Sequence, residues 1–353
     1  MGGITLSRRP NSTERMKRTT YRVTRAGSFR RLLRFEEELG PPADNEVTIA
    51  VKGIGLNFAD VFTVLGLYRA APKRDCIPGI EFSGEVIATG KNATARPIGQ
   101  RVMGSIRFGA FVTHLNIDEQ YVVPIPDDWS YGEGAAFIVQ SLTAYYALTS
   151  LGNLSPSQTV LIHSAVGGVG IYANRIAKAF SAFTIGTVGT ADKVALAREE
   201  GYDAVIVRSR TFPRDLRSAL NGRRLDLILD AVGGRVQKQS FAMLGPSGRL
   251  VAYGLSGFAS HMPTPNYLML AGKYVAMPRY STLDLIESNR SLLGFNLIWI
   301  YDRVEVWREM VQRILDLHLP RPRVGMTFPF DRLVEAARTL QSGKTSGKIV
   351  VTV

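Results

Sequence analysis

The most informative stretch of the chain is TVLIHSAVGGVG, residues 159–170, where a phosphate-binding turn directly follows a buried strand. Thr159–His163 is a short apolar run rich in β-branched residues, which predicts a strand. Alanine and glycines then keep the spacing of the dinucleotide-binding fingerprint, and the next helix begins with its N-terminus toward the phosphates. Backbone N–H groups can approach a pyrophosphate closely at such a turn. The residues predicted to hold the cofactor here are Ala165, Gly167, Gly168, Val169 and Gly170.

Length and composition place the chain among globular proteins. At 353 residues two domains are expected, and the apolar fraction of 45% excludes a disordered protein. No apolar run reaches the roughly 18 residues that a membrane span needs. The single cysteine, Cys76, excludes an internal disulfide and suits a reducing compartment, so we expect a cytoplasmic protein.

The formal net charge of +13 raises the question of an anionic partner. Nucleic-acid binders concentrate their positive charge in a patch, whereas arginine is scattered along this whole chain. We therefore expect no nucleic-acid partner. Residues 1–19, which are basic and without pattern, are interpreted as a disordered tail. Weak attraction of this tail to an anionic surface is the alternative left open.

Two different patterns divide the chain. From residue 20 to about residue 128, short β-like runs are separated by Gly and Pro, which is typical of a compact, largely antiparallel barrel-like domain. From about residue 132, strands and helices alternate, which predicts a doubly wound parallel sheet. The chain ends in an apolar strand, residues 348–353, which we expect to rejoin the first domain. GKTSGKIV, residues 343–350, lacks P-loop spacing and is interpreted as a turn into that strand.

Several motifs in order resemble those of the medium-chain dehydrogenase/reductase superfamily. Beside the glycine turn they are LNFAD (56–60), PGIEFSGEV (78–86), LTAYYAL (142–148), GTADK (189–193) and NRSLLGFNL (289–297). They are similar to the zinc-free quinone oxidoreductase and enoyl reductase branch. Within it they resemble the vesicle amine transport protein group and the enoyl reductase domains of curacin-type polyketide synthases.

The resemblance implies an α/β protein of two domains. A GroES-like, mainly β catalytic domain is expected at residues 20–135 and 284–353, and a Rossmann NADPH-binding domain with a doubly wound parallel sheet at 136–283. It also implies that no metal is bound. Asn57 lies in the segment of the first Cys ligand of zinc-dependent relatives, and Ile80 replaces the His of their Gly-His-Glu motif. We also expect a homodimer.

The residues after the second strand of the parallel sheet favour NADPH over NADH. Thr190 stands where an NAD-dependent fold has an acidic residue, and Lys193 and Arg208 supply positive charge for a 2′-phosphate. Asp192, directly before Lys193, is interpreted as a helix cap rather than as a ligand of the ribose, the alternative left open. The resemblance adds further residues to the cofactor site, namely Thr143, Gly254, Phe295 and Asn296.

Tyr68 and Asn57 are the residues that the resemblance places at the reacting centre. Neither is a strong acid or base, which favours catalysis by placement, with hydride passing from NADPH to the acceptor while hydrogen bonds hold the developing enolate. Tyr68 is the candidate proton donor, and solvent is the competing source.

Two functions remain open at this point. One is an NADPH-dependent reductase of a small-molecule quinone, enone or enoyl thioester. The other is an NADPH-binding, non-catalytic or membrane-associated partner protein of the vesicle amine transport type. Alcohol oxidation is disfavoured, because no zinc is expected to act as a Lewis acid.

Overall fold

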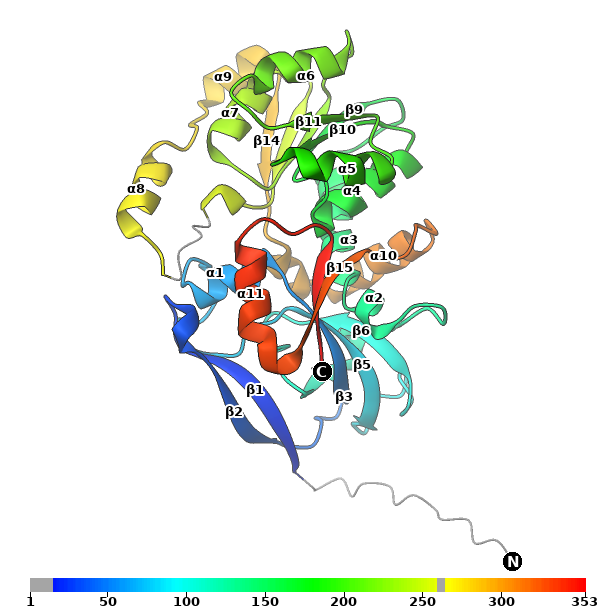
Figure 1. The fold of residues 1–353 in the computed structure, drawn as a ribbon. Helices are drawn as coiled ribbons and strands as arrows, with labels where there is room; N and C mark the ends of the chain where they lie inside the picture. Colours follow the sequence, from blue (N-terminus) through cyan, green and yellow to red (C-terminus); the bar gives the residue numbers. More distant parts are fainter. Residues whose placement is uncertain (1–14, 259–263) are drawn as a thin grey trace, which may run out of the picture.

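The computed structural model describes residues 15–258 and 264–353, which form two lobes (Figure 1). One lobe is built on a seven-stranded sheet with the order β15-β16-β3-β5-β6-β8, in which β7 also pairs with β3. A three-stranded sheet, β2-β1-β4, lies beside it, and among these strands only β15 and β16 pair in parallel. The strands are β1 (Met16–Arg25), β2 (Leu32–Leu39), β3 (Glu46–Gly55), β4 (Arg74–Cys76), β5 (Glu81–Thr89), β6 (Arg101–Ser105), β7 (His114–Asp118), β8 (Val122–Pro124), β15 (Val324–Pro329) and β16 (Lys348–Thr352).

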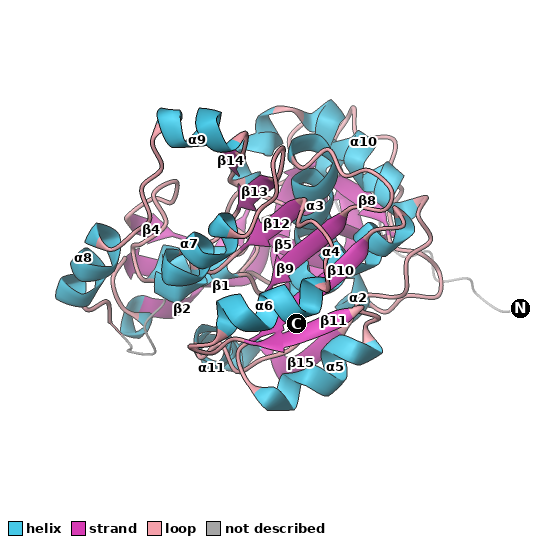
Figure 2. Ribbon diagram, turned by 90° about the horizontal axis from the view of Figure 1, so that it is seen from above, coloured by secondary structure: helices cyan, strands magenta, loops and turns pink. Residues whose placement is uncertain are grey.

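The other lobe is a six-stranded parallel sheet with the order β11-β10-β9-β12-β13-β14, which confirms the predicted doubly wound architecture. Figure 2 shows this sheet between two layers of helices. Its strand β9 is buried at every position, as expected where both faces are covered. The strands are β9 (Thr159–His163), β10 (Phe183–Val188), β11 (Ala204–Val207), β12 (Leu227–Asp230), β13 (Arg249–Ala252) and β14 (Ser291–Gly294).

The helices cover the sheets and the junction between the lobes. No helix in the ranges described is long and apolar enough to cross a membrane. Trp307 of α10 is fully buried and packs in the same core as α3 and α4, so one apolar core extends across the junction. The helices are α1 (Phe58–Val64), α2 (Tyr131–Gly134), α3 (Ile138–Tyr145), α4 (Gly168–Ala179), α5 (Val194–Glu199), α6 (Phe212–Leu220), α7 (Gly234–Ala242), α8 (Tyr267–Val275), α9 (Thr282–Ser288), α10 (Val304–Leu315) and α11 (Leu333–Gln341).

The C-terminal strand β16 returns to the first lobe, as the sequence predicted. It pairs antiparallel with β3, with Val350 opposite Gly55, and Figure 1 shows the two strands together. The predicted domain boundary at residue 284 is wrong, because β14 adds a sixth parallel strand to the nucleotide-binding sheet, with Ser291 opposite Arg249. We therefore place the crossing back to the first lobe after Gly294.

The predicted disordered tail, residues 1–19, is also too long. Residues 1–14 lie outside the described part of the chain, but β1 already begins at Met16, which lies opposite Leu39 of β2. Arg18 donates to the Glu37 carboxylate at 2.7 Å, and this charge pairing across the two strands explains how a polar segment forms a strand.

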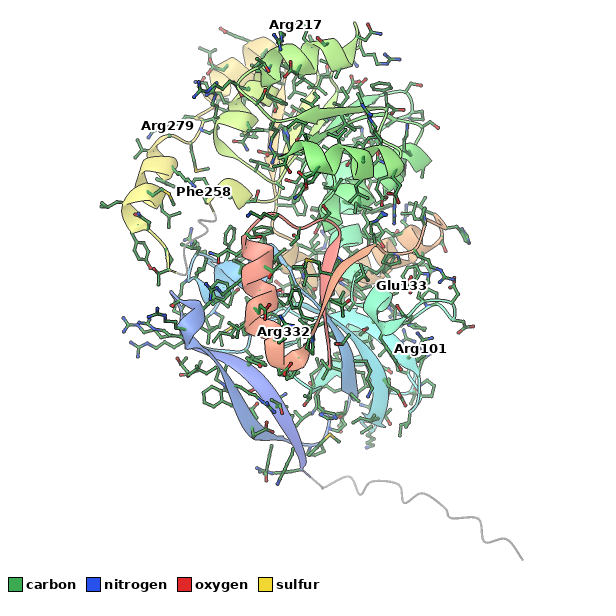
Figure 3. All side chains as sticks on the ribbon, viewed as in Figure 1. Arg101, Glu133, Arg217, Phe258, Arg279 and Arg332 are labelled. Carbon is green, nitrogen blue, oxygen red and sulfur yellow. The ribbon has the colours of Figure 1, made fainter. Side chains whose placement is uncertain are left out.

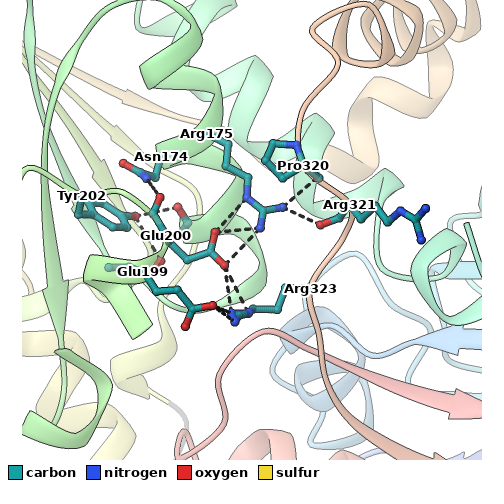
Figure 4. Close-up of polar contacts among 10 residues, drawn as sticks. Asn174, Arg175, Glu199, Glu200, Tyr202, Pro320, Arg321 and Arg323 are labelled. Carbon is teal, nitrogen blue, oxygen red and sulfur yellow. Dashed lines mark hydrogen bonds and ion pairs between the residues drawn. The ribbon is translucent and has the colours of Figure 1, made fainter. Parts of the chain in front are cut away.

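A buried charge network fastens the lobes together at α4 (Figure 4). The guanidinium of Arg175 donates to the Glu200 carboxylate and, at 3.1 and 2.9 Å, to the carbonyl oxygens of Pro320 and Arg321. Arg323 joins the same carboxylate from the segment that leads into β15. The side chain of Glu200 is only 5% exposed, so its charge depends on these partners.

Glu200→Gln should lower the free energy of unfolding by about 3 kcal/mol, because two guanidinium groups lose the carboxylate that neutralises them. Glu309→Gln is the matched control. Glu309 pairs with Arg313 on the surface of α10, and such a pair contributes only about 0.5 kcal/mol. Urea unfolding of both variants measures the difference, and equal losses would show that the buried network contributes no more than a surface pair.

Candidate active site

A cleft of about 1830 Å³ is lined by residues of both lobes. Every residue that the sequence assigned to the cofactor or to catalysis lines it, so the tertiary structure brings the whole predicted set together. These residues are Asn57, Tyr68, Thr143, Ala165, Gly167, Gly168, Val169, Gly170, Thr190, Lys193, Arg208, Gly254, Phe295 and Asn296. Their individual roles remain predictions.

The turn after β9 has the geometry that a phosphate site requires. Ser164 adopts a left-handed conformation with φ of 58°, which turns the chain toward α4. A Cβ atom at Gly170 would lie 2.3 Å from the carbonyl oxygen of Ser164, so only glycine permits this close packing. The helix α4 then begins at Gly168 with its N-terminus at the cleft, where its unpaired N–H groups favour an anion.

The basic residues predicted to bind the 2′-phosphate lie at one end of the cleft. Arg208 donates to the hydroxyl of Thr187 at 3.2 Å, which orients its guanidinium. Thr190 is exposed at the N-terminus of the short turn Ala191–Lys193. Asp192 lies inside that turn and also lines the cleft, so its predicted role as the cap is wrong.

Lys193 has a second task that the sequence did not indicate. Its ammonium donates to the carbonyl oxygens of Gly343 and Thr345, at 3.0 and 2.9 Å. Burial lowers the pKa of Lys193, and the carboxylate of Asp192 opposes that shift. Lys193 therefore holds the loop between α11 and β16 against the nucleotide-binding lobe.

That loop is part of the site, although the sequence indicated only a turn into the last strand. The N–H of Gly347 donates to the carbonyl of Val166 within the phosphate-binding turn, at 2.8 Å. Lys344 is exposed on the loop and lines the cleft. The lobe that contains β16 thus contributes the positive charge of Lys344 to the cleft, which local sequence could not show because the loop is far from the phosphate-binding turn along the chain.

Tyr68 and Asn296 form the polar pair at the other end of the predicted site. The Tyr68 hydroxyl donates to Oδ1 of Asn296 at 2.7 Å, so the loop after α1 meets the segment after β14. Burial raises the pKa of Tyr68 to about 12. The phenol therefore keeps its proton at neutral pH, and in this structure Oδ1 of Asn296 accepts its hydrogen bond. The ring of Phe108 contacts that of Tyr68 edge to face, with centroids 6.2 Å apart.

A buried ion pair lies behind Asn57 at the floor of the cleft. The ammonium of Lys348 in β16 donates to Oε2 of Glu81 in β5 and to Oδ1 of Asn57, each at 2.7 Å, and also to Oε1 of Gln140 in α3. The other carboxylate oxygen of Glu81 accepts the Val139 N–H at 2.9 Å, at the N-terminus of α3. Sequence reasoning missed this network because Lys348 and Glu81 are 267 residues apart.

The network also settles the orientation of the Asn57 amide. Since Oδ1 accepts from Lys348, Nδ2 faces Oε2 of Glu81 at 3.3 Å and the carbonyl of Gly55 at 3.0 Å. Both amide hydrogens are thereby used inside the protein. Similarly, the Thr143 hydroxyl donates to the carbonyl of Val139 at 2.6 Å. Toward a ligand, both side chains present oxygen acceptors, and Tyr68 can donate only by turning its hydroxyl away from Asn296.

Comparison with known proteins agrees with this geometry. Residues 43–127 match the alcohol dehydrogenase GroES-like domain, and residues 168–316 match the family described as zinc-binding dehydrogenase. The synaptic vesicle membrane protein VAT-1 homolog of Danio rerio is 31% identical over 342 residues, covering 94% of this chain and 70% of that protein.

Two solved structures show the same fold. Escherichia coli quinone oxidoreductase complexed with NADPH superposes with a TM-score of 0.83 at 26% identity, over 95% of this chain and 100% of that one. CurK enoyl reductase superposes with a TM-score of 0.81 at 24% identity, over 95% of this chain and 99% of that one. At this identity the match shows a similar fold.

A GroES-like lobe joined to a parallel nucleotide-binding sheet, with a glycine turn opening into the cleft between them, defines a two-domain dehydrogenase-type fold. The chain belongs to the medium-chain dehydrogenase/reductase superfamily, and the VAT-1 homologs are its relatives there. The family resemblance predicted from the sequence motifs is confirmed.

The residues present do not fit the zinc that the matched family's description implies. Asn57 and Ile80 stand at the positions expected for zinc ligands, and the ammonium of Lys348 lies between Asn57 and Glu81, where it would repel a cation. Cys76 is the single cysteine of the chain and is buried, and one thiol does not make a zinc site. Across residues 15–258 and 264–353, no three or more His, Cys, Asp or Glu side chains gather as a metal site.

Purified protein should therefore contain far less than one zinc per chain, even after expression in zinc-supplemented medium. Chelators should leave its activity unchanged. Elemental analysis by mass spectrometry measures the metal content, and a stoichiometric zinc on which activity depends would contradict the expectation.

Proposed function

We propose that the protein is a zinc-independent, NADPH-dependent reductase that transfers a hydride to a quinone or to the activated C=C bond of an enone or enoyl thioester. The observation that carries this proposal is the Tyr68–Asn296 hydrogen bond, which lies in the same cleft as the dinucleotide-binding turn. The fold relative from Escherichia coli, a quinone oxidoreductase complexed with NADPH, supports the choice of cofactor and of reaction class.

The residues of the cleft suit a reaction that is catalysed by positioning the cofactor and the acceptor and by hydrogen bonds to the acceptor. When bound, NADPH would supply a hydride for the β-carbon of the acceptor, and a proton would add to the α-carbon, so that the C=C bond becomes single. Tyr68, protonated at neutral pH, would turn its hydroxyl hydrogen from Oδ1 of Asn296 to the carbonyl oxygen on which negative charge develops. The ion pair behind Asn57 keeps the floor of the cleft rigid. Reduction of a quinone uses the same hydride and one proton and gives a hydroquinone.

Tyr68→Phe removes one hydroxyl and little volume, so folding and NADPH affinity should survive. If Tyr68 holds the enolate or supplies the proton, kcat should fall by roughly 10²–10⁴, the range for one acid–base group. Tyr267→Phe, on the exposed face of α8, is the control and should leave kcat unchanged. Stopped-flow measurement of NADPH oxidation checks both variants, and an unchanged kcat for Tyr68→Phe would assign the proton to solvent.

Preference for NADPH should depend on the basic residues at the phosphate end. Arg208→Ala should lower the affinity for NADPH by roughly ten- to a hundredfold, since one charge-assisted contact to phosphate contributes about 1.5–3 kcal/mol of binding free energy. NADH should bind nearly as before. Lys193→Ala should act in the same direction, with an added effect from release of the loop that contains Lys344.

Fluorescence titration with both cofactors gives these affinities. Lys238→Ala is the control, because Lys238 is exposed on α7 and does not line the cleft. Equal losses for NADPH and NADH in the Arg208 variant would show that Arg208 does not bind the 2′-phosphate.

The alternative function is an NADPH-binding protein without turnover that acts through a partner or a membrane. It is kept because several relatives are named synaptic vesicle membrane proteins. NADPH oxidation at 340 nm with benzoquinones, a simple enone and a crotonyl thioester side by side separates the two. Saturable NADPH binding with no turnover of any of them would favour the alternative.

We also propose that the protein acts in the cytoplasm as a homodimer. Among the described strands, β14 is the last of the parallel sheet and pairs only with β13, and its Leu292 is 38% exposed. Proteins usually cover such an edge. The mass of the protein in solution, measured by light scattering, checks the dimer, and a monomer at micromolar concentration would contradict it.

A further inference from the structure

The helix α8 is apolar, yet none of its residues is buried. It stands beside the upper lobe in the view of Figure 3, close to the labelled Phe258 and Arg279. Leu268 is 87% exposed and Tyr274 is 72% exposed. A helix of this kind leaves apolar area uncovered unless a further molecule packs against it.

One side of α8 turns into the cleft. Its N-cap residue Asn266, together with Met269 and Lys273, lines the cavity, and their spacing of three and four residues places them on one helical face. Met277, just after the helix, lines the cavity as well. Methionine side chains are flexible and adapt to apolar surfaces of varied shape, as a ligand wall requires.

Among the described residues, a polar contact of Lys273 ties the helix to the chain that precedes it. The ammonium of Lys273 donates to the carbonyl oxygen of Gly257 at 2.6 Å. This places the charged end of Lys273 at the backbone and leaves its hydrocarbon stem along the wall of the cleft. The charge therefore does not interrupt the apolar stripe made by the methionines.

The catalytic lobe contributes matching apolar side chains to the same cleft. Phe58 and Phe62, one turn apart on α1, line the cleft, and their rings meet edge to face with centroids 6.2 Å apart. Leu67 lies next to Tyr68 and also lines the cavity. The surroundings of the proposed reacting centre are thus apolar on both lobes.

The cleft is larger than a pocket that encloses a single drug-sized ligand. Pockets that enclose a drug-sized ligand are about 300–1000 Å³, whereas this cleft is about 1830 Å³. A volume of this size is compatible with a second ligand beside a dinucleotide.

We propose that the acceptor is an amphiphile, with its reducible quinone, enone or enoyl thioester head at Tyr68 and a hydrocarbon chain of about eight or more carbons along α1 and α8. This proposal rests on the proposed reductase function. Hydride adds to the β-carbon and a proton to the α-carbon, so NADPH becomes NADP⁺ and the chain itself takes no part in the chemistry. The chain packs on the face of α8 that lines the cleft, Met269 included, which is favourable because apolar surface leaves water.

A chain-length series tests the proposal. The probes are N-acetylcysteamine thioesters of trans-2-butenoate, trans-2-octenoate and trans-2-decenoate, used with NADPH below their critical micelle concentrations. Complete burial of one CH₂ group corresponds to about fourfold in kcat/KM. With partial burial, kcat/KM should rise roughly tenfold or more from the four-carbon to the ten-carbon acceptor.

Two neighbouring substitutions on α8 make the test specific to its inner face. Met269→Glu places a charge on the face that lines the cleft, so the ratio of kcat/KM for ten and four carbons should fall toward one. Leu268→Glu is the matched control, since Leu268 points to solvent, and it should keep the ratio of the parent protein. The ratio is the readout because it cancels effects on NADPH binding and on folding.

Hydrogen exchange supplies a readout that needs no turnover. The saturated decanoyl thioester should slow exchange of the amides of α8, and the butanoyl thioester should not. The proposal would be overturned, while the reductase function stands, if the four-carbon acceptor is turned over but kcat/KM does not change with chain length and the amides of α8 are not protected. Protection of α8 by the decanoyl thioester without turnover of any acceptor would support the chain site and overturn the reductase function.

Discussion

The buried ion pair of Lys348 and Glu81 is the interaction on which the catalytic lobe and its cleft depend. The two residues are 4% and 0% exposed, and removing such charges from water costs several kcal/mol per ion unless each is fully hydrogen-bonded. The requirement is met, because all three donors of the Lys348 ammonium find oxygens. Burial lowers the pKa of Lys348, and the Glu81 carboxylate opposes that shift. The strands β5 and β16 and the helices α1 and α3 therefore hold one arrangement.

The backbone around this pair is packed so closely that a side chain would not fit. At Gly55 a Cβ atom would lie 1.9 Å from the carbonyl oxygen of Ala135 and 2.8 Å from Cε of Lys348. Nearby, the carboxyl group of Asp60 is buried and accepts the N–H groups of Asn57 and Gly79, and burial raises its pKa to about 7. The floor of the cleft is thus a rigid polar layer, and apolar side chains such as Phe62 lie around it.

The segment that leads into Lys348 links this floor with the phosphate end of the cleft. Gly347 bonds to the phosphate-binding turn, and Lys193 holds the carbonyls of Gly343 and Thr345. On the other side of the junction, Arg175 and Glu200 fasten α4 and α5 to the chain before β15. The relative position of the two lobes therefore depends on contacts near the cofactor site itself.

The sequence did not predict the strand β14 or the first residues of β1, because each is stabilised by the neighbouring strand rather than by an apolar pattern of its own. The strand β14 has only four residues and three of them are exposed, so its pattern does not indicate a sheet. Residues 16–19 form a strand because basic side chains face acidic ones on β2. In both cases the neighbouring strand, distant in sequence, supplies the stabilising contacts.

The turn at residues 159–170 could be predicted from the chain alone, because strand, glycines and helix are contiguous and the constraint at Gly170 arises from Ser164, six positions earlier. The family motifs were sufficient for the fold and for the set of residues around the cleft. What those residues can donate or accept required the folded protein. Asn57 has both amide hydrogens occupied only because Glu81 and Gly55 lie beside it, and its oxygen is held by a lysine almost at the other end of the chain. Hydrogen bonds form between atoms that are close in space, and no local pattern records which distant residue will be there.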